Sequence, residues 1–504
     1  MKRALALSVL SGILYAAAQP PLDLGALAFV ALVPLLAASV TSSAQARLLA
    51  GGVAGTVAGV GCVGTSVYEA ARLYFAQPAW ASALFALLVP LVYGAPYFAL
   101  FALAAGPACR DRERIVRPLL VVAAAWAASE YLRANVWHGT PWCLLAHSQM
   151  DAPALLQTAS FGGAFAVSFV IALANAAVFA CVPAIARALP ARALAGRVAV
   201  AGGLLAAAVL YGRSEIGRWS APAGRPLRVA IVQPNVPAEW RDSLARVPEI
   251  LRRLTNLTRT AAASDPSLVV WPENAVGFAV EANTLSLRDA GEALPDGAKL
   301  LLGAPRSVIG QGGDATFRNA AFLVDRDGAI LASQDKRRLT PFAEEWPAEL
   351  PRPAGRRDAY RPGERVTLLD VDGVPTGVLI CSESIYPELA RDLVAAGAHL
   401  VVNISNDAWF GRSPAPVHHL NAVRLRAVEL RRFIVRSTNT GLSAVIAPTG
   451  ALTAEAPPGK QAVATADVVP IGEDTLYARF GDLFAWISIA FIAVEWLLRG
   501  RRDR

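Results

Sequence analysis

Long apolar runs alternate with short charged segments over the first 212 residues of the chain, and one more apolar run follows near its end. A helix needs about 20 mainly apolar residues to cross a bilayer, and charge, Pro or Gly marks its ends. The first run follows a basic N-terminus but reads as a retained span, because six more runs come after it. The pattern predicts eight membrane spans, at 4–18, 22–40, 49–68, 80–105, 117–133, 162–186, 195–212 and 481–499.

Between the seventh and eighth runs, short apolar strands are separated by helical or loop segments. Such a pattern is typical of an α/β layered domain with its chemistry at the C-terminal ends of strands. We therefore predict a multi-pass α-helical membrane domain with about seven helices at 1–220, an α/β catalytic domain at 226–472, and a last span with its tail at 478–504.

Composition and charge indicate where in the cell the protein is located. With 504 residues, 55% hydrophobic content and a mean hydropathy of +0.42, the chain is too apolar for an ordinary soluble enzyme. When the predicted spans are counted from the N-terminus, all the basic loops lie on one side of the membrane. The positive-inside rule assigns that side to the cytoplasm. The α/β domain is then expected in the periplasm of a bacterium, outside the inner (cell) membrane. The net charge of +8 is explained by these loops and anionic lipid, so no nucleic-acid partner is expected.

Three candidate reactive residues follow predicted strands. Glu273 follows "LVVW", Lys336 follows "AILASQD" and Cys381 follows "GVLI", so all three could project from the same edge of one sheet. A carboxylate can take the thiol proton, and an ammonium can stabilise a thiolate or an oxyanion. These residues suffice for acyl transfer through a thioester.

Each of the three also has a structural explanation. Cys381 could be an inert core cysteine, Glu273 a solvated acid, and Lys336 part of a basic patch with Arg337 and Arg338. The other four cysteines lie in the predicted membrane part, so an intradomain disulfide is not expected. No Cys/His cluster has zinc-ligand spacing, and we predict neither a metal nor a cofactor.

The motifs resemble known families. Residues 227–470 resemble the carbon-nitrogen hydrolase (nitrilase) superfamily through "WPE", "DKRRLTPFAEEWP" and "ICSES". The whole chain is similar to the apolipoprotein N-acyltransferase family, with further matches in "HGTPWCLLAHSQ", "NISNDAWFG" and the segment 418–441. The resemblance implies a nitrilase-like α-β-β-α sandwich, with seven spans before it and one after it.

The resemblance also implies roles for individual residues. It makes Glu273 the general base, Lys336 the stabilising cation and Cys381 the nucleophile. Glu344 of "PFAEEWP" corresponds to a glutamate of the oxyanion environment, and Glu383 to a second supporting acid.

Five further residues are candidates for substrate binding. The family commonly has an aromatic residue where Ser382 stands, which bears on how an acyl chain packs beside the nucleophile. Aromatic side chains near loops could line a lipid entrance or simply anchor the fold, and an asparagine could hydrogen-bond around the site. The candidates are Trp240, Asn319, Trp346, Ser382 and Trp409.

The implied reaction is ping-pong, and it completes lipoprotein maturation. The thiolate takes an acyl chain from a phospholipid, typically phosphatidylethanolamine, and the thioester passes it to the α-amine of a diacylglyceryl apolipoprotein. A monomer is expected. Two alternatives stay open: a membrane-tethered nitrilase-type amidase, and a non-catalytic envelope transport or docking protein. A transporter should carry ionisable residues inside its spans, and Glu130 and Arg133, which could simply pair, are the main ones here.

Overall fold

Two compact units make up the protein. The computed structural model describes residues 1–504 except 41, 241–242, 283, 310–314, 347–359 and 503–504. One unit comprises Met1–Arg218, Phe410–Asn421 and Thr475–Arg504, and the other comprises Trp219–Trp409 and Ala422–Asp474. We call the first the helical unit and the second the sandwich unit.

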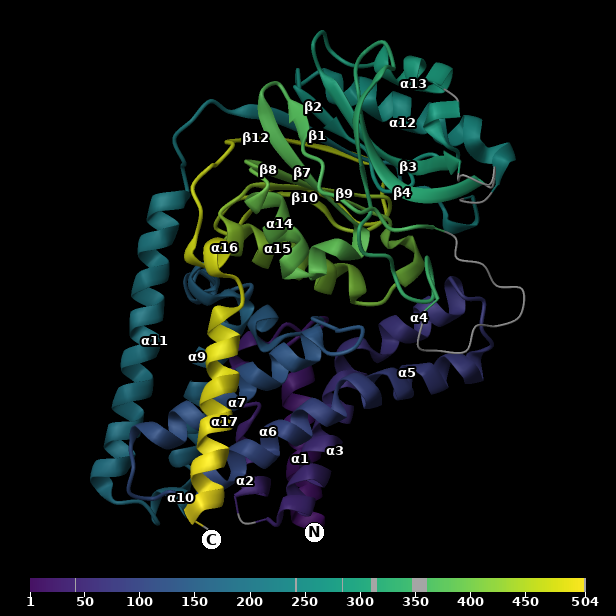
Figure 1. Ribbon diagram of the computed structural model, residues 1–504. Coiled ribbons are helices and arrows are strands. Elements are labelled where there is room, and N and C mark those ends of the chain that lie inside the picture. Colours follow the sequence, from purple (N-terminus) through teal and green to yellow (C-terminus); the bar gives the residue numbers. More distant parts are fainter. Residues whose placement is uncertain (41, 241–242, 283, 310–314, 347–359, 503–504) are drawn as a thin grey trace. The chain divides into compact units, whose positions relative to one another are not determined.

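The helical unit contains the apolar runs found in the sequence. Within it, α7 packs against α6, α9 and α17 (Figure 1). Its helices are α1 (Lys2–Ala17), α2 (Val33–Ser39), α3 (Ala44–Gly59), α4 (Thr65–Leu73), α5 (Ala79–Tyr93), α6 (Ala95–Ala108), α7 (Val116–Asn135), α8 (Pro153–Leu156), α9 (Ala159–Ala180), α10 (Pro183–Ala186), α11 (Ala191–Trp219), α16 (Leu476–Phe480) and α17 (Leu483–Arg502).

Among the described residues, four helical segments are long and apolar enough to cross a membrane. These segments are Ala44–Leu73, Ala79–Ala108, Ala159–Ala180 and Ala191–Trp219. Each coincides with one of the predicted spans. The other predicted spans fall on α1, the short apolar segment Gly25–Ser39, α7 and α17, which lie outside this set, so the total of eight stays a prediction.

Small residues allow the helices to approach closely. Gly51, Gly55 and Gly59 repeat at four-residue spacing along α3. A Cβ atom on Gly55 would lie 2.5 Å from the carbonyl oxygen of Gly94, and one on Gly59 would lie 2.8 Å from Cβ of Pro90. Membrane helices associate through such backbone contacts because lipid offers no hydrophobic driving force between them. The glycine stripe therefore fixes how α3 packs against the α5–α6 segment.

Glu130 and Arg133 of α7 find partners inside the helical unit. The Glu130 carboxylate accepts a hydrogen bond from the Leu145 amide at 2.6 Å and lies 3.9 Å from Nη2 of Arg133. Arg133 and Tyr15 both donate to the carbonyl oxygen of Cys143, at 3.2 and 2.6 Å. Glu130 and Arg133 thus pair, as the sequence suggested, and they hold the loop after α7 in place.

The sandwich unit contains two six-stranded mixed sheets. The first has the order β12-β1-β2-β3-β4-β5, and the second has the order β11-β10-β9-β8-β7-β6. The first sheet comprises β1 (Leu227–Gln233), β2 (Leu268–Val270), β3 (Lys299–Ile309), β4 (Ala315–Val324), β5 (Ile330–Asp335) and β12 (Ala462–Val468). The second comprises β6 (Leu369–Val371), β7 (Val374–Ile380), β8 (Leu400–Ser405), β9 (Ile434–Thr438), β10 (Ser443–Ile446) and β11 (Leu452–Ala456).

Helices cover the outer faces of the sheets. Along β1, Val229 and Ile231 join the core between the sheets, whereas Ala230 and Val232 pack toward α12 (Val247–Ala262) and α13 (Thr284–Gly291). Successive strand residues point to opposite faces, so a strand buried on both faces is apolar throughout. The helix α14 (Pro387–Ala395) packs on β7, and α15 (Ala415–Leu430) follows β8 in the chain. This is the expected α-β-β-α sandwich (Figure 1).

One prediction about this unit is wrong. Glu273 and Lys336 follow β2 and β5 of the first sheet, but Cys381 follows β7 of the second sheet. The candidate residues therefore do not project from one sheet edge. An apolar strand looks alike in either sheet, because pairing between distant strands leaves no local mark on the sequence.

Candidate active site

Glu273 is held at the end of β2 by a buried tryptophan. Trp271 is fully buried, and its indole N–H donates to Oγ1 of Thr258 on α12 at 2.9 Å. The chain then passes so close to β3 that a Cβ atom on Gly303 would lie 2.6 Å from Cα of Glu273. Only glycine fits at this crossing, so Gly303 sets the depth at which the Glu273 carboxylate enters the site.

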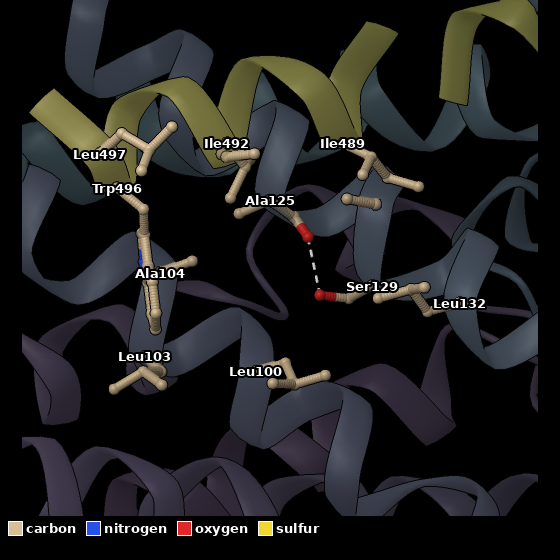
Figure 2. A pocket seen from close by; sticks show the side chains of 12 residues that line it. Leu100, Leu103, Ala104, Ala125, Ser129, Leu132, Ile489, Ile492, Trp496 and Leu497 are labelled. Carbon is tan, nitrogen blue, oxygen red and sulfur yellow. Dashed lines mark hydrogen bonds between the residues drawn. The ribbon is translucent and has the colours of Figure 1, made fainter. Parts of the chain in front are cut away.

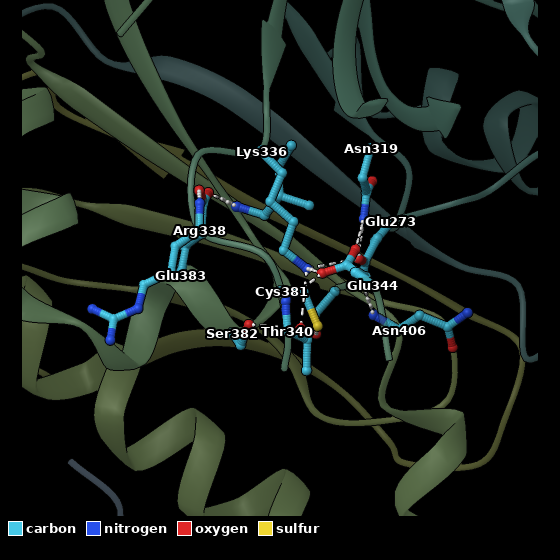
Figure 3. Close-up of polar contacts among 12 residues, drawn as sticks. Glu273, Asn319, Lys336, Arg338, Thr340, Glu344, Cys381, Ser382, Glu383 and Asn406 are labelled. Carbon is cyan, nitrogen blue, oxygen red and sulfur yellow. Dashed lines mark hydrogen bonds and ion pairs between the residues drawn. The ribbon is translucent and has the colours of Figure 1, made fainter. Parts of the chain in front are cut away.

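Lys336 carries its charge into the interior between two carboxylates. Its side chain is 1% exposed, and Nζ lies 2.7 Å from Oε2 of Glu344 and 3.5 Å from Oε1 of Glu273 (Figure 3). Asn319 on β4 donates through Nδ2 to both acids, at 2.7 Å to Glu273 and 2.8 Å to Glu344. One cation and one amide thus hold the two carboxylates side by side.

Cys381 occupies a strained turn directly after β7. It begins the 3₁₀ turn η7 (Cys381–Ile385) with φ of +54°, a value that costs energy for a residue with a side chain. Its side chain is 3% exposed. The thiol is buried at the edge of the core between the sheets, where Cys381 packs with residues of that core.

Glu383 connects this turn to the segment that follows Lys336. Its Oε1 accepts from the amides of Arg337 and Arg338, at 2.6 and 3.1 Å, and its Oε2 accepts from the amide of Ile380 at 2.8 Å. The predicted supporting acid therefore acts on the backbone. It fastens the segment that carries the cation to the turn that carries the thiol.

The charges of the site interact strongly. Burial by itself lowers the pKa of Lys336, but the Glu344 and Glu273 carboxylates raise that pKa well above its ordinary value. Burial raises the pKa of Glu344, and the Lys336 charge outweighs this effect, so the net pKa of Glu344 is lowered. At neutral pH the pair is therefore fully charged.

The thiol is held in its protonated form. Burial raises the pKa of Cys381, the Glu273 carboxylate raises it further, and Lys336 opposes both effects. The resulting pKa lies above the ordinary value of 9.0. A reaction at Cys381 would therefore need a base, and Glu273 is the carboxylate whose charge raises this pKa most, ahead of Asp407.

The raised pKa has a measurable consequence. The rate at which iodoacetamide alkylates Cys381 is expected to keep rising with pH beyond 9.0, because the thiolate fraction grows until the pH exceeds the pKa. Peptide-level mass spectrometry of the full-length protein measures this rate, with a short cysteine peptide as the reference thiol. A plateau below pH 9 would contradict the assignment.

The other candidate residues are placed as follows. Ser382 Oγ lies 3.1 Å from Oγ1 of Thr340, whose hydroxyl lies 3.5 Å from Nζ of Lys336. Trp346 packs edge-on against Phe342, with ring centroids 5.3 Å apart.

Two further tryptophans pack outside this polar network. Trp240 lies beneath the guanidinium groups of Arg246 and Arg253, 4.7 and 5.0 Å from its ring centroid. Trp409 packs against the core between the sheets. The structure thus brings Ser382 next to the Lys336 network, whereas Trp240 stacks with arginines and Trp409 packs against the core between the sheets.

Sequence reasoning missed a polar group behind the thiol. Ser405, at the end of β8, lies with Oγ 3.6 Å from Sγ of Cys381 and 2.9 Å from Oδ1 of Asp407. Asp407 pairs with the fully buried Arg436 at 2.7 Å. The adjacent Asn406 amide donates to Oε2 of Glu273 at 3.0 Å. The sequence feature that could have pointed to Ser405 is the polar run in "NISND", at the end of an apolar strand.

The arrangement suits acyl transfer. A carboxylate can take the thiol proton, and a fixed ammonium can stabilise the oxyanion of a tetrahedral intermediate. Within the described part of the chain, no group of three or more His, Cys, Asp or Glu side chains could hold a metal ion.

The chain matches family models and is similar to solved structures. A model of the carbon-nitrogen hydrolase family matches residues 228–471, and a model of the apolipoprotein N-acyltransferase N-terminal domain matches residues 11–177. A solved amidase from Nesterenkonia sp. covers 52% of this chain and 97% of its own, at 22% identity and a TM-score of 0.40.

Relatives match almost the full length of the chain. The apolipoprotein N-acyltransferase of Geobacter metallireducens is 33% identical over 98% of this chain and 95% of its own. That of Azotobacter vinelandii is 34% identical over 99% of this chain and 95% of its own. The chain is therefore an acyltransferase that belongs to the apolipoprotein N-acyltransferase family, with a carbon-nitrogen hydrolase domain.

Proposed function

We propose that Cys381 takes an acyl chain from a membrane phospholipid and passes it to the α-amine of a diacylglyceryl-cysteine at the N-terminus of a lipoprotein. The observation that carries the proposal is the buried cluster of Cys381, Glu273, Lys336 and Glu344, in a chain with several helices apolar enough to cross a membrane.

In the first half-reaction Glu273 accepts the thiol proton, and the Cys381 sulfur attacks the carbonyl carbon of the sn-1 ester. Lys336 stabilises the oxyanion, and Glu344 keeps that ammonium in place. The intermediate then collapses, the bond to the glycerol oxygen breaks, and Glu273 returns the proton to that oxygen. A lysophospholipid leaves and a thioester remains on Cys381.

In the second half-reaction the α-amine attacks the thioester carbonyl and loses one proton to Glu273. Lys336 again faces the oxyanion. The carbon–sulfur bond breaks, the amide is released, and the proton on Glu273 returns to the sulfur. The enzyme thus regains its starting state without a cofactor.

The membrane supplies both substrates. Moving an acyl chain into water costs about 0.8 kcal/mol per CH₂ group, so ester and amine are best joined at headgroup depth. The basic loops between the apolar runs support a location of the protein in the inner membrane, with the sandwich unit in the periplasm. Phosphatidylethanolamine is the proposed donor, and the enzyme is proposed to act as a monomer.

A two-stage labelling experiment tests this function. Purified full-length protein in detergent–lipid micelles is incubated with phosphatidylethanolamine that is radiolabelled in its sn-1 chain. Label that stays on the protein and is released by hydroxylamine is expected, because hydroxylamine cleaves thioesters. A diacylglyceryl-cysteine peptide added next is expected to take up the label in a hydroxylamine-stable amide.

Two results would oppose the proposal. One is a protein that takes no label from phospholipid and releases ammonia from a small amide such as acetamide, as expected of a tethered amidase. The other is a labelled protein that does not transfer the chain to the peptide, which would assign another acceptor.

A further inference from the structure

A groove and a polar cluster lie outside the proposed mechanism. The groove belongs to the helical unit and is lined by α6, α7 and α17 (Figure 2). Among the described residues that line it none carries a charge, and the hydroxyl of Ser129 donates to the carbonyl oxygen of Ala125 at 2.7 Å. The groove therefore offers an apolar surface without a reactive group. The polar cluster belongs to the sandwich unit and begins at Ser405, directly beside the proposed nucleophile.

The pairing of two strands places Ser405 beside Cys381. The strands β7 and β8 are parallel neighbours, and Ile380 of β7 is paired with Ile404 of β8. The next residue in the chain is Cys381 after the one and Ser405 after the other. Ser405 is fully buried, and its Oγ lies 3.6 Å from Sγ of Cys381. The register of the sheet thus holds the hydroxyl against the sulfur.

The Ser405 hydroxyl has one hydrogen and two acceptors within reach. Oδ1 of Asp407 lies 2.9 Å from the Ser405 oxygen, and the Cys381 sulfur lies 3.6 Å from it. A neutral thiol is a weak acceptor, so the hydrogen points to the carboxylate while the thiol is protonated. A negatively charged sulfur is a strong acceptor, and rotation about the bond between carbon and oxygen then turns the hydrogen toward it.

Arg436 supports both the serine and the nucleophile. It is fully buried, and its Nη2 lies 2.7 Å from Oδ2 of Asp407. Its Nη1 donates to Oδ1 of Asn403. Asn403 in turn donates through Nδ2 to the carbonyl oxygens of Leu379 and Cys381, at 2.9 and 3.5 Å. The guanidinium therefore opposes the Asp407 charge, which by itself disfavours a thiolate, and it also holds the backbone that carries the sulfur.

We propose that Ser405 is a further catalytic residue, whose hydroxyl donates a hydrogen bond to the Cys381 sulfur whenever that sulfur carries negative charge. This occurs after Glu273 has removed the thiol proton, and again when the thioester breaks and the sulfur departs. Ser405 neither gains nor loses a proton. Asp407 and Arg436 are positioning residues, since they act through the serine. The catalytic role rests on the function proposed above, whereas the hydrogen bond to the thiolate requires no acyl donor.

Alkylation of Cys381 by iodoacetamide tests the hydrogen bond without a lipid substrate. The rate is measured at pH 8 on the full-length protein by peptide-level mass spectrometry, and it follows the thiolate fraction. Ser405→Ala is expected to lower this rate at least about tenfold, the factor that one hydrogen bond to a charged group supplies. Peptide acylation should fall with it. Ser405→Thr keeps the hydroxyl and should restore most of both rates.

The direction of the change separates hydrogen bonding from packing. Ser405→Ala removes an atom beside a buried thiol, so a purely structural role would loosen the site and make alkylation faster. The matched control is Ser437→Ala, because Ser437 is equally buried and its hydroxyl donates to the carbonyl oxygens of Val232 and Val270, at 3.2 and 3.1 Å. This control should alkylate at the rate of the unaltered protein.

The outcomes distinguish this inference from the proposed function. Alkylation of Ser405→Ala at or above the rate of the unaltered protein would overturn the inference, and so would an equal slowing in Ser437→Ala. Slower alkylation with undiminished peptide acylation would overturn the catalytic role of Ser405. If the unaltered protein transfers no acyl chain but Ser405→Ala still slows alkylation, the hydrogen bond to the thiolate is supported and the proposed function fails.

Discussion

Replacing Cys381 by alanine is expected to abolish both the acyl label on the protein and the transfer of the acyl chain to a lipoprotein peptide. Without the sulfur there is no thioester, and the direct reaction lacks its nucleophile. We expect acyl transfer to fall at least about 1,000-fold, which corresponds to about 4 kcal/mol of transition-state stabilisation. The measurement is the initial rate of peptide acylation, together with hydroxylamine-sensitive label on the protein.

The control is Cys181→Ala, which removes an exposed thiol of the helical unit. This variant should label and transfer at the rate of the unaltered protein. Labelling of the Cys381→Ala variant at an undiminished level would show that the acyl group is carried elsewhere, and the proposed mechanism would fail.

Replacing Lys336 by methionine is expected to abolish activity and also to destabilise the fold. The change leaves the buried Glu273 and Glu344 carboxylates without their cation, and removal of one partner from a buried ion pair costs about 3–5 kcal/mol. Chemical denaturation followed by near-ultraviolet circular dichroism measures the loss. The double variant Lys336→Met/Glu344→Gln should recover much of the stability but none of the activity.

The difference in stability depends on pH in a defined direction. Because Lys336 lowers the pKa of Glu344, the pair stabilises the fold above the ordinary value of 4.5 and loses this contribution as the pH falls through the lowered pKa. The gap between the unaltered protein and Lys336→Met should therefore shrink as the pH is lowered below 4.5. A gap that is constant with pH would mean that the lysine stabilises the fold by packing alone.

Local sequence patterns were sufficient to select the residues that we propose to be reactive. Glu273, Lys336 and Cys381 were visible because each is a polar or reactive residue within three positions of the end of an apolar strand. The assignment of strands to two sheets was not visible, because strand pairing joins segments far apart in the chain. Asn319 was among the candidates, yet its contact with both acids depends on the register of β4 against β3.

Other features depend on tertiary contacts that no local pattern records. The carboxylate of Glu383 accepts three backbone hydrogen bonds, whereas its place in "CSES" suggests only an acid near the nucleophile. Ser405 ends a strand like many buried serines, and only the fold brings it beside Cys381. The apolar pattern gave the positions of the helices, whereas the number that cross the membrane stays a prediction.

The distribution of the reactive groups over two sheets has a consequence for how the family can diversify. The proposed base and the proposed nucleophile stand on opposite halves of the sandwich, so their separation is governed mainly by the hydrophobic layer in between and by the backbone hydrogen bonds of Glu383. Surface loops can then lengthen, shorten or change sequence to admit acyl acceptors of different bulk while the reacting atoms keep their spacing. Chemistry and substrate choice are in this way encoded by different parts of the chain and can evolve separately.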